Sequence, residues 1–369
     1  MSLPSSPVRD EIRAIAPYNA GLTIEEVRRR YAVTEIAKLG SNENPLGPAP
    51  ALRHLFSDIG ELARLYPDPE GRALRVRLAL DFAVSADRVV LGNGSEDLIA
   101  VLCRTILRPG DVMATLYPSF PLHEDYAVLM GGRVERVAVT ADLDVDMEAL
   151  IAAARRKPRL LMLSNPMNPV GAWLTSSRLA ALLSAIDPET VLVVDEAYAE
   201  YADGADCPSA VALLEGSDLS WAVLRTFSKA YGLAGLRIGY GIVSDAALTG
   251  FLDRSRTPFN TNAIAQAAAL VALEDRDHLR RSVELAVGER ERLRAALAVL
   301  GFRIAPSLGN FLFFGGEEES GALAERLLAK GVIVKPWKQP GFERFLRVSI
   351  GAPRENDQFL GALKAVTGR

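Results

Sequence analysis

Short segments that are apolar along almost their whole length alternate with helical stretches between about residues 70 and 245. A strand of this kind must be covered on both faces, which is typical of a mostly parallel sheet flanked by helices. In such a sheet, ligands bind beyond the carboxyl ends of the strands. We therefore predict an α/β fold with functional side chains directly after the apolar segments. These segments are RVVLG (88–92), DVMATL (111–116), RVERVAV (133–139), RLLMLSN (159–165), TVLVVDEA (190–197), WAVLRTF (221–227) and RIGYGIV (237–243).

The rest of the chain divides into an arm and a second unit of different character. The first 20 residues are proline-rich and have no sustained period, which indicates an arm lying on another part of the protein or on a partner subunit. A helical stretch over about 262–298 leads to short apolar strands and helices typical of a small α+β unit. We predict an N-terminal arm (1–20), a large α/β domain (46–261) and a small α+β domain (21–45 and 262–369).

Composition excludes several classes of partner. A formal charge of −4 and a pI near 5.7 give no basic surface for nucleic acid, although a small anionic metabolite is compatible with them. Because the two cysteines, Cys103 and Cys207, lack C-x-x-C spacing, we expect neither a disulfide framework nor a metal site. The N-terminus lacks the apolar core of a signal peptide, and no run of about 18 apolar residues occurs. We expect a cytoplasmic protein with no nucleic-acid or membrane partner.

Candidate ligand contacts lie directly after the first two apolar segments, RVVLG and DVMATL. Gly94, Ser95 and Glu96 open a helix after RVVLG, where free N–H groups and the helix dipole attract an anion. A simple N-cap is the alternative interpretation of Ser95. Phe120 follows DVMATL and can lie against a planar ring, although an ordinary packed aromatic residue is the simpler interpretation.

Three further polar residues follow the later segments. Asn168 lies in a proline-braced loop, where an asparagine also suits turn formation. Asp195 ends a four-residue aliphatic run, and a carboxylate in so apolar a setting is costly unless it is paired. Its partner is either a bound cation or a structural arginine or lysine. Lys229 follows WAVLRTF in a chain with only seven lysines, and lysine is seldom placed near a core without a reason.

Together these residues match the requirements of pyridoxal 5′-phosphate. An amine such as that of Lys229 forms a Schiff base with the aldehyde of this cofactor. A buried carboxylate such as that of Asp195 keeps the pyridine nitrogen protonated, so that the ring can accept electrons. The helix N-terminus at Ser95, reinforced by Ser228 and Arg237, would hold the cofactor phosphate.

A resemblance to a known family rests on seven motifs in the expected order, which are NENPLGP, YPDP, GNGSEDL, NPMNPVG, DEAY, RTFSKAYGLAGLRIGY and LRVSIG. The chain resembles the pyridoxal-phosphate-dependent aminotransferases of fold type I, and NENP with YPDP is similar to the histidinol-phosphate aminotransferase branch. The match runs from about Pro17 to the last helix. It implies a mostly parallel central sheet flanked by helices, a smaller α+β domain, and a homodimer with a shared active site.

The resemblance also implies roles for individual residues. Lys229 would be the catalytic Schiff-base lysine and proton carrier, and Asp195 would pair with the pyridine nitrogen. Phe120 would stack on the ring, at a position where tyrosine is common in the family. Tyr66 would reach the cofactor phosphate from the other subunit. Asn168 and Tyr198 would hydrogen-bond the ring hydroxyl. The phosphate would be held by Gly94, Ser95, Glu96 through its backbone N–H, Ser228 and Arg237.

The substrate end is expected around Arg347. This arginine lies in an apolar segment, and its planar guanidinium suits a carboxylate or a phosphate. By the resemblance, Tyr18 and Lys335 help it to bind the substrate. Lys335 departs from the family, in which arginine is common at this position. A lysine offers a point charge instead of the planar fork of a guanidinium. Among the histidines, His123 is the candidate for the pocket wall, since it follows YPSF.

The reaction implied by the resemblance is transamination between L-histidinol phosphate and 2-oxoglutarate, which gives imidazole acetol phosphate and L-glutamate in histidine biosynthesis. An aromatic amino-acid aminotransferase on the same scaffold is the nearest alternative, because Arg347 serves either anion. The threonine-phosphate decarboxylases share much of this frame. A dinucleotide-binding oxidoreductase is a further alternative, but LGNG lacks the third glycine and such an enzyme leaves Lys229 and Asp195 unexplained.

Overall fold

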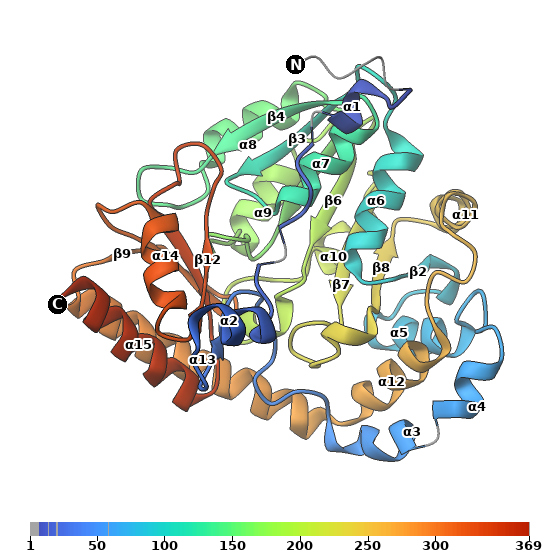
Figure 1. Cartoon of the computed structure of the whole chain (residues 1–369). Helices are drawn as coiled ribbons and strands as arrows, with labels where there is room; N and C mark the ends of the chain where they lie inside the picture. The colour runs from blue at the N-terminus through green and yellow to red at the C-terminus, as the bar shows by residue number, and fades with distance from the viewer. Residues whose placement is uncertain (1–6, 14, 20, 58, 369) are drawn as a thin grey trace.

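The computed structural model describes residues 7–13, 15–19, 21–57 and 59–368. At its centre is a seven-stranded sheet made from the seven apolar segments (Figure 1). All of these strands run parallel to one another except β8. The prediction of a mostly parallel sheet is therefore confirmed. In spatial order the strands are β2 (Val89–Gly92), β8 (Gly239–Val243), β7 (Trp221–Thr226), β6 (Val191–Asp195), β5 (Leu160–Ser164), β3 (Val112–Tyr117) and β4 (Arg133–Ala138).

Helices cover both faces of this sheet. Alternate residues of a strand point to opposite faces, and since both sets are apolar here, both faces must be shielded from water. In β5, Leu160 and Met162 pack in one hydrophobic cluster, whereas Leu161 and Leu163 pack in another. The first face is covered by α6 (Ser95–Ile106), α7 (Pro121–Leu129) and α11 (Ala246–Ser255). The opposite face is covered by α5 (Arg72–Phe82), α8 (Met147–Arg155), α9 (Ser176–Leu183), α10 (Ala210–Leu214) and α12 (Ala263–Glu274).

A smaller, four-stranded antiparallel sheet forms the second unit. The side chains of Phe311, Phe314 and Phe359 are fully buried in its own hydrophobic cluster. In spatial order its strands are β12 (Lys335–Pro336), β13 (Phe345–Ser349), β10 (Phe311–Gly315) and β9 (Arg303–Ile304). The accompanying elements are α13 (Arg276–Val299), α14 (Ser320–Leu328), α15 (Pro353–Thr367) and the parallel pair of β1 (Ala37–Lys38) with β11 (Val332–Ile333).

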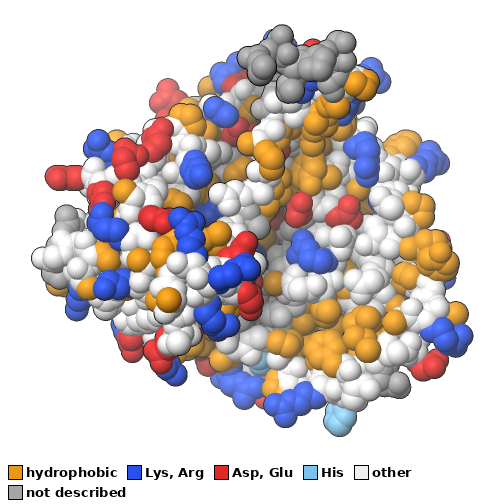
Figure 2. Space-filling view, viewed as in Figure 1, with side chains coloured by type: hydrophobic (Ala, Val, Ile, Leu, Met, Phe, Trp, Pro, Cys, Tyr) orange, Lys and Arg blue, Asp and Glu red, His pale blue; other side chains and the backbone are white. Residues whose placement is uncertain are grey.

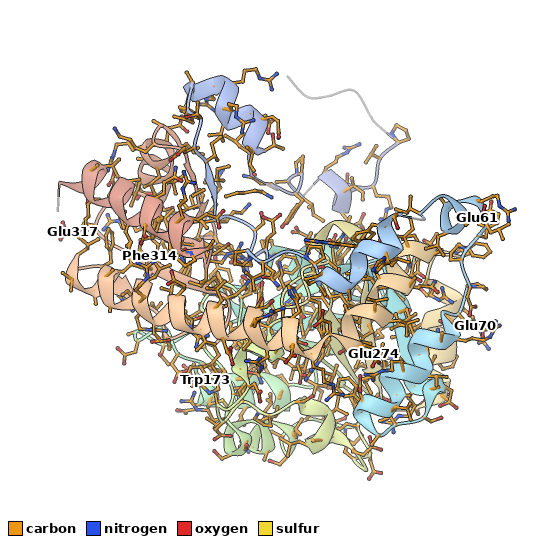
Figure 3. The ribbon with its side chains drawn as sticks, turned by 90° about the horizontal axis from the view of Figure 1, so that it is seen from below. Glu61, Glu70, Trp173, Glu274, Phe314 and Glu317 are labelled. Carbon is orange, nitrogen blue, oxygen red and sulfur yellow. The ribbon has the colours of Figure 1, made fainter. Side chains whose placement is uncertain are left out.

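The 24-residue helix α13 joins the two units. Its residue Leu279 packs against both hydrophobic clusters. Figure 3 shows α13 crossing the molecule between the side of Glu274, which ends α12, and the side of Phe314 in the small sheet. Helix α12, which the sequence-based division assigns to the small domain, packs on the large sheet.

The described part of the N-terminal arm lies on the same chain. The Nη2 atom of Arg9 donates to the carbonyl oxygen of Leu129 at 3.1 Å, next to α1 (Asp10–Arg13). Residues 1–6, 14 and 20 of the predicted arm lie outside the described residues. Among the helices of the described residues, none combines the length and the apolar character needed to cross a membrane. The remaining helices are α2 (Ile24–Tyr31), α3 (Arg53–Ser57), α4 (Ile59–Arg64) and the 3-10 turns η1 (Pro50–Leu52), η2 (Ala86–Arg88), η3 (Ala199–Ala202) and η4 (Ala234–Leu236).

Candidate active site

A cavity of about 600 Å³ lies between the large sheet, the small sheet and residues 16–19. Figure 2 shows the hollow on this face, with basic and acidic side chains around its rim. Most of the site residues expected from the sequence line this cavity, while Gly94 and Tyr66 do not. The residues brought together are Tyr18, Ser95, Glu96, Phe120, Asn168, Asp195, Tyr198, Ser228, Lys229, Arg237, Lys335 and Arg347.

Lys229 lies in the loop directly after β7. Its Nζ atom donates to the carbonyl oxygen of Ser41 at 2.9 Å, and the neighbouring carbonyl of Ala230 accepts from Nδ2 of Asn44 at 2.8 Å. Burial, and then the positive charge of Arg347, lowers the pKa of Lys229 to about 7. The amine is therefore partly neutral near pH 7, and a neutral amine is both a nucleophile and a base.

Asp195 ends β6 with its carboxylate facing the cavity. Its Oδ1 atom accepts from the backbone N–H of Ala197 at 3.1 Å, and its Oδ2 atom lies 3.4 Å from Nε2 of His123. In the part of the chain that the structure describes, no lysine or arginine forms an ion pair with Asp195. Among the described residues the structural alternative of an Arg or Lys partner is therefore not met, and the carboxylate remains able to pair with a cation in the cavity.

His123 is fully buried on α7 and does not line the cavity, contrary to the expectation from YPSF. It contacts Asp195 from the protein side, and its Nδ1 atom has no hydrogen-bond partner among the described residues. Burying a ring nitrogen without a hydrogen-bond partner costs free energy. Packing alone therefore does not account for a histidine at position 123. Sequence reasoning missed this contact because the two residues are 72 positions apart.

A network of amides surrounds the hydroxyl of Tyr198. This hydroxyl accepts from Nδ2 of Asn168 at 3.2 Å and from Nδ2 of Asn42 at 3.0 Å. Burial raises the pKa of Tyr198 to about 12, so its own O–H stays available for donation. Asn42, from the NENPLGP motif, is fully buried and also accepts from Oγ of Ser349 at 2.9 Å. Asn42 of this motif therefore helps to hold the hydroxyl of Tyr198 in position.

The N-terminus of α6 forms an anion-binding corner with Arg237 and Ser228. The Nη1 atom of Arg237 donates to Oγ of Ser228 at 3.2 Å, and its Nη2 atom donates to the carbonyl oxygen of Asn93 at 3.4 Å. The helix begins at Ser95 with Gly94 as its N-cap, so Ser95 is not the N-cap of the alternative interpretation. Gly94 has φ +86°, and a Cβ there would lie 2.4 Å from Nη2 of Arg237. Helix N–H groups, a guanidinium and a hydroxyl converge here, which suits a phosphate.

The two aromatic candidates have different positions. Phe120 is the N-cap of α7, lines the cavity and contacts His123 edge-on, with ring centroids 5.7 Å apart. Tyr66 lies outside the cavity, is 84% exposed, and stacks on Phe259 with ring centroids 4.7 Å apart. The structure therefore does not bring Tyr66 into the cavity of its own chain.

Arg347, in β13, is the buried cation of the small unit. Its Nη1 atom donates to Oδ1 of Asn168 at 2.9 Å, and its Nη2 atom donates to the carbonyl oxygen of Gly40 at 2.7 Å. Its Nε atom is buried and has no partner among the described residues. Burial lowers the pKa of Arg347. A buried guanidinium whose described contacts are all neutral is a strong binding point for an anion.

Lys335 and Tyr18 extend this end of the cavity toward solvent. The Nζ atom of Lys335 lies 5.8 Å from the ring centroid of Tyr18 and donates to the carbonyl oxygen of Asn19. Burial, and then the charges of Arg347 and Lys338, lowers the pKa of Lys335 to about 8. Because these positive charges repel one another, an anion bound among them is favoured.

Among the lining residues that sequence reasoning missed are Asp125, Trp337 and Gln339. The Oε1 atom of Gln339 accepts from the backbone N–H of Ser119 at 3.0 Å and from Nε1 of Trp337 at 2.9 Å, which ties the small unit to the loop before α7. Asp125 lies one helical turn after Pro121 on α7, and both line the cavity. The i, i+4 spacing could have pointed to Asp125, but no local pattern points to Gln339 or Trp337.

A mostly parallel sheet with a lysine after one strand, a buried carboxylate at the end of the neighbouring strand and an anion-binding corner at a helix N-terminus is typical of fold type I, to which the aminotransferases belong. The family model "Aminotransferase class I and II" matches residues 34–363. The chain belongs to this family.

Named relatives are similar to this chain over nearly its whole length. It is 68% identical to histidinol-phosphate aminotransferase 3 of Rhizobium meliloti (strain 1021), over 99% of each chain. It is 57% identical to histidinol-phosphate aminotransferase 1 of Mesorhizobium japonicum, over 98% of this chain and 99% of that one. Among solved structures, histidinol-phosphate aminotransferase from Sinorhizobium meliloti, in complex with pyridoxal-5′-phosphate, has a TM-score of 0.89 at 29% identity and covers 99% of this chain and 98% of its own.

Proposed function

We propose that this chain transfers the amino group of L-histidinol phosphate to 2-oxoglutarate with pyridoxal phosphate as cofactor, in histidine biosynthesis. The products are imidazole acetol phosphate and L-glutamate. The observation that carries the proposal is that one cavity holds two separate cationic sites, Arg237 at the N-terminus of α6 and Arg347 with Lys335 on the small sheet. The cofactor and the substrate each bring one phosphate. The names of the relatives support this substrate and do not favour an aromatic amino acid.

The residues of the cavity fit the cofactor. Bound pyridoxal phosphate supplies a carbonyl group that reacts with amines and a ring that accepts electrons. Asp195 would face the ring nitrogen, which is consistent with a carboxylate that has no Arg or Lys partner among the described residues. Phe120 would lie against the ring. Asn168 and Tyr198 would bind the hydroxyl of the cofactor. Its phosphate would be held by Gly94, Ser95, the backbone N–H of Glu96, Ser228 and Arg237.

Lys229 is the proposed catalytic residue. With a pKa of about 7, part of the amine is neutral near pH 7, and its Nζ atom can then accept the proton from the amino-bearing carbon of the substrate. The carbonyl of Ser41, 2.9 Å away, holds the amine in place within the cavity. Proton transfer by a positioned group of matched pKa is the role that this geometry supports.

Arg347 is the proposed anion contact of both substrates. A transaminase takes two substrates in turn at one site, so the guanidinium must accept the carboxylate of glutamate and then the phosphate of histidinol phosphate. A planar fork can bind either anion through two parallel hydrogen bonds. Lys335 and the hydroxyl of Tyr18 add the further donors that a phosphate dianion requires.

The finer proposal is a homodimer with a shared site in the cytoplasm. Large apolar side chains are exposed around Tyr66, among them Ile59, Leu65 and Phe259, and Figure 2 shows hydrophobic side chains gathered on the lower part of this face. A contiguous exposed apolar patch is typical of an interface, and Tyr66 would reach the partner's cofactor phosphate across it. The two free cysteines, Cys103 and Cys207, suit a reducing compartment.

The test uses the visible absorption band of the cofactor bound to the purified chain. Histidinol phosphate and phenylalanine are added separately, without 2-oxoglutarate. We expect histidinol phosphate alone to abolish the band and 2-oxoglutarate to restore it. A change mainly with phenylalanine would transfer the chain to the aromatic branch, and no change with either would contradict amino transfer.

A further inference from the structure

Among the described residues, three carboxylates line the active-site cavity, those of Glu96, Asp125 and Asp195. Asp195 contacts His123 and a backbone N–H. Glu96 accepts from the hydroxyl of Tyr126 at 3.0 Å and lies 3.8 Å from Nη2 of Arg237. No hydrogen bond or ion pair from the described residues reaches the side-chain carboxylate of Asp125. Its carboxylate is therefore available to a ligand, and neither the proposed cofactor contacts nor the anion contacts of the substrate use it.

Asp125 and the cationic residues of the small unit line the cavity from different elements. On the large unit, α7 presents Pro121 and Asp125 at i and i+4, on one face of the helix. On the small unit, β12, β13 and the loop between them present Lys335, Lys338 and Arg347. A ligand that bears an anion at one end and a hydrogen-bond donor at the other is matched by this arrangement.

The surroundings of Asp125 make it responsive to such a donor. Burial, and then the negative charge of Glu124, raises the pKa of Asp125. A carboxylate that is partly desolvated beside a like charge gains more from an N–H donor than a fully hydrated one does. A phenyl ring in the same place offers no donor and would leave the carboxylate unpaired.

We propose that Asp125 determines specificity for the ring of the substrate, by accepting an imidazole N–H of histidinol phosphate and disfavouring a phenyl ring. This inference rests on the proposed function. Imidazole has a pKa of about 6.5, and both its neutral and its protonated form carry at least one N–H, so the contact exists in either form. Arg347 cannot make this distinction, because it binds the anionic end that both kinds of substrate share. Sites built to hydrogen-bond a substrate reject analogues that lack the donor.

The experiment compares the holoenzyme with the variants Asp125→Leu and Asp125→Asn on three amino donors. These are histidinol phosphate, phenylalaninol phosphate, which has phenyl in place of imidazole, and glutamate. For Asp125→Leu we expect kcat/KM for histidinol phosphate to fall about tenfold or more, the size of one charge-assisted hydrogen bond. Asp125→Asn keeps a neutral acceptor and should lose less. The values for phenylalaninol phosphate and glutamate should stay the same or rise.

Asp142→Asn is the matched control, because Asp142 is exposed and does not line the cavity. It should leave the ratio of the two phosphate donors unchanged. Equal losses on both phosphate donors, or no loss on either, would overturn the role of Asp125. A wild-type enzyme that uses glutamate but not histidinol phosphate would contradict the proposed function as well. A wild type active on histidinol phosphate, with an unchanged ratio in both Asp125 variants, would contradict this inference alone.

Discussion

The cofactor end and the substrate end of the cavity are built in different ways. At the cofactor end, Asn168, Asp195 and Lys229 each follow a strand of one sheet within a few residues. At the substrate end, Tyr18, Lys335 and Arg347 come from the N-terminal segment and two strands of the other sheet. The first end is positioned by neighbouring, largely buried strands of one sheet, whereas the second depends on how separate segments pack.

The electrostatics of the two ends differ in the same sense. At the cofactor end, hydrogen bonds hold several polar groups in place, as in the contacts of Tyr198 with Asn168 and of Arg237 with Ser228, while Asp195 has no Arg or Lys partner among the described residues. At the substrate end, burial and then the positive charges of Arg347 and Lys338 lower the pKa of Lys335. Polar groups that hold one another in place are preorganised for one ligand. Positive charges that repel one another instead favour any anion that reduces the repulsion. The comparison explains how one cavity can keep one cofactor and exchange two substrates.

Removal of the lysine at the cofactor end should have the largest effect. In Lys229→Ala the proton carrier is lost, so we expect kcat to fall by about 10³-fold or more, within the range of general acid–base catalysis. Steady-state kinetics measures this loss, and circular dichroism checks that the variant is folded. Lys229→Arg is the control, since it keeps a positive charge but has no neutral amine near pH 7, and it should be similarly inactive. Turnover near the wild-type rate in either variant would contradict the role of Lys229 as the proton carrier at the cofactor end.

The carboxylate at the cofactor end should affect the reaction more than binding. In Asp195→Ala we expect kcat to fall about 10²-fold, the typical size of one electrostatic contact to a developing charge. The Kd of the cofactor should change less, because its phosphate would be held by Arg237. Arg237→Ala should show the reverse, a weaker Kd with turnover retained at saturating cofactor. Equal changes in both quantities for Asp195→Ala would indicate that this residue is structural.

A pH profile tests whether the two ends are coupled. Only the neutral amine of Lys229 can react with pyridoxal phosphate, so capture of the cofactor by the apoenzyme should slow about tenfold per pH unit below about 7 and level off above it. In Arg347→Gln a like charge is removed, the pKa of Lys229 rises, and the plateau should begin at higher pH. Stopped-flow absorbance measures the rate. An identical profile in wild type and variant would mean that the ends act independently.

The half-buried lysine of the substrate end should have the smallest effect. For Lys335→Ala we expect KM for histidinol phosphate to rise a few-fold, roughly one modest charge-assisted contact, with kcat within about a factor of two. Lys335→Arg, which restores the fork common in the family, should hold or lower KM. Steady-state kinetics with histidinol phosphate and with glutamate separates the effect on phosphate from a general loss. A large fall in kcat for Lys335→Ala would place this residue at the reacting atoms instead.

The sequence predicted the large sheet well because its signal is local. Each of the seven apolar segments became a strand, with bounds that differ by one or two residues. The last of them begins later than expected, at Gly239, because Arg237 adopts the left-handed conformation with φ +56°. The roles assigned to Lys229, Asp195 and the other site residues stay predictions that the experiments above address.

By itself, the sequence determined the strands of the large sheet and the order of polar residues at the strand ends, because burial on both faces imposes a readable pattern on neighbouring residues. Only the tertiary structure decided which distant groups meet. Arg347 donates a hydrogen bond to Asn168, 179 positions away in the sequence, and His123 contacts Asp195, 72 positions away. The carboxylate of Asp125 has no hydrogen-bond or ion-pair partner among the described residues. Hydrogen bonds between distant segments leave no period in the sequence, since they depend on the packing of two units whose contact is set by many residues at once.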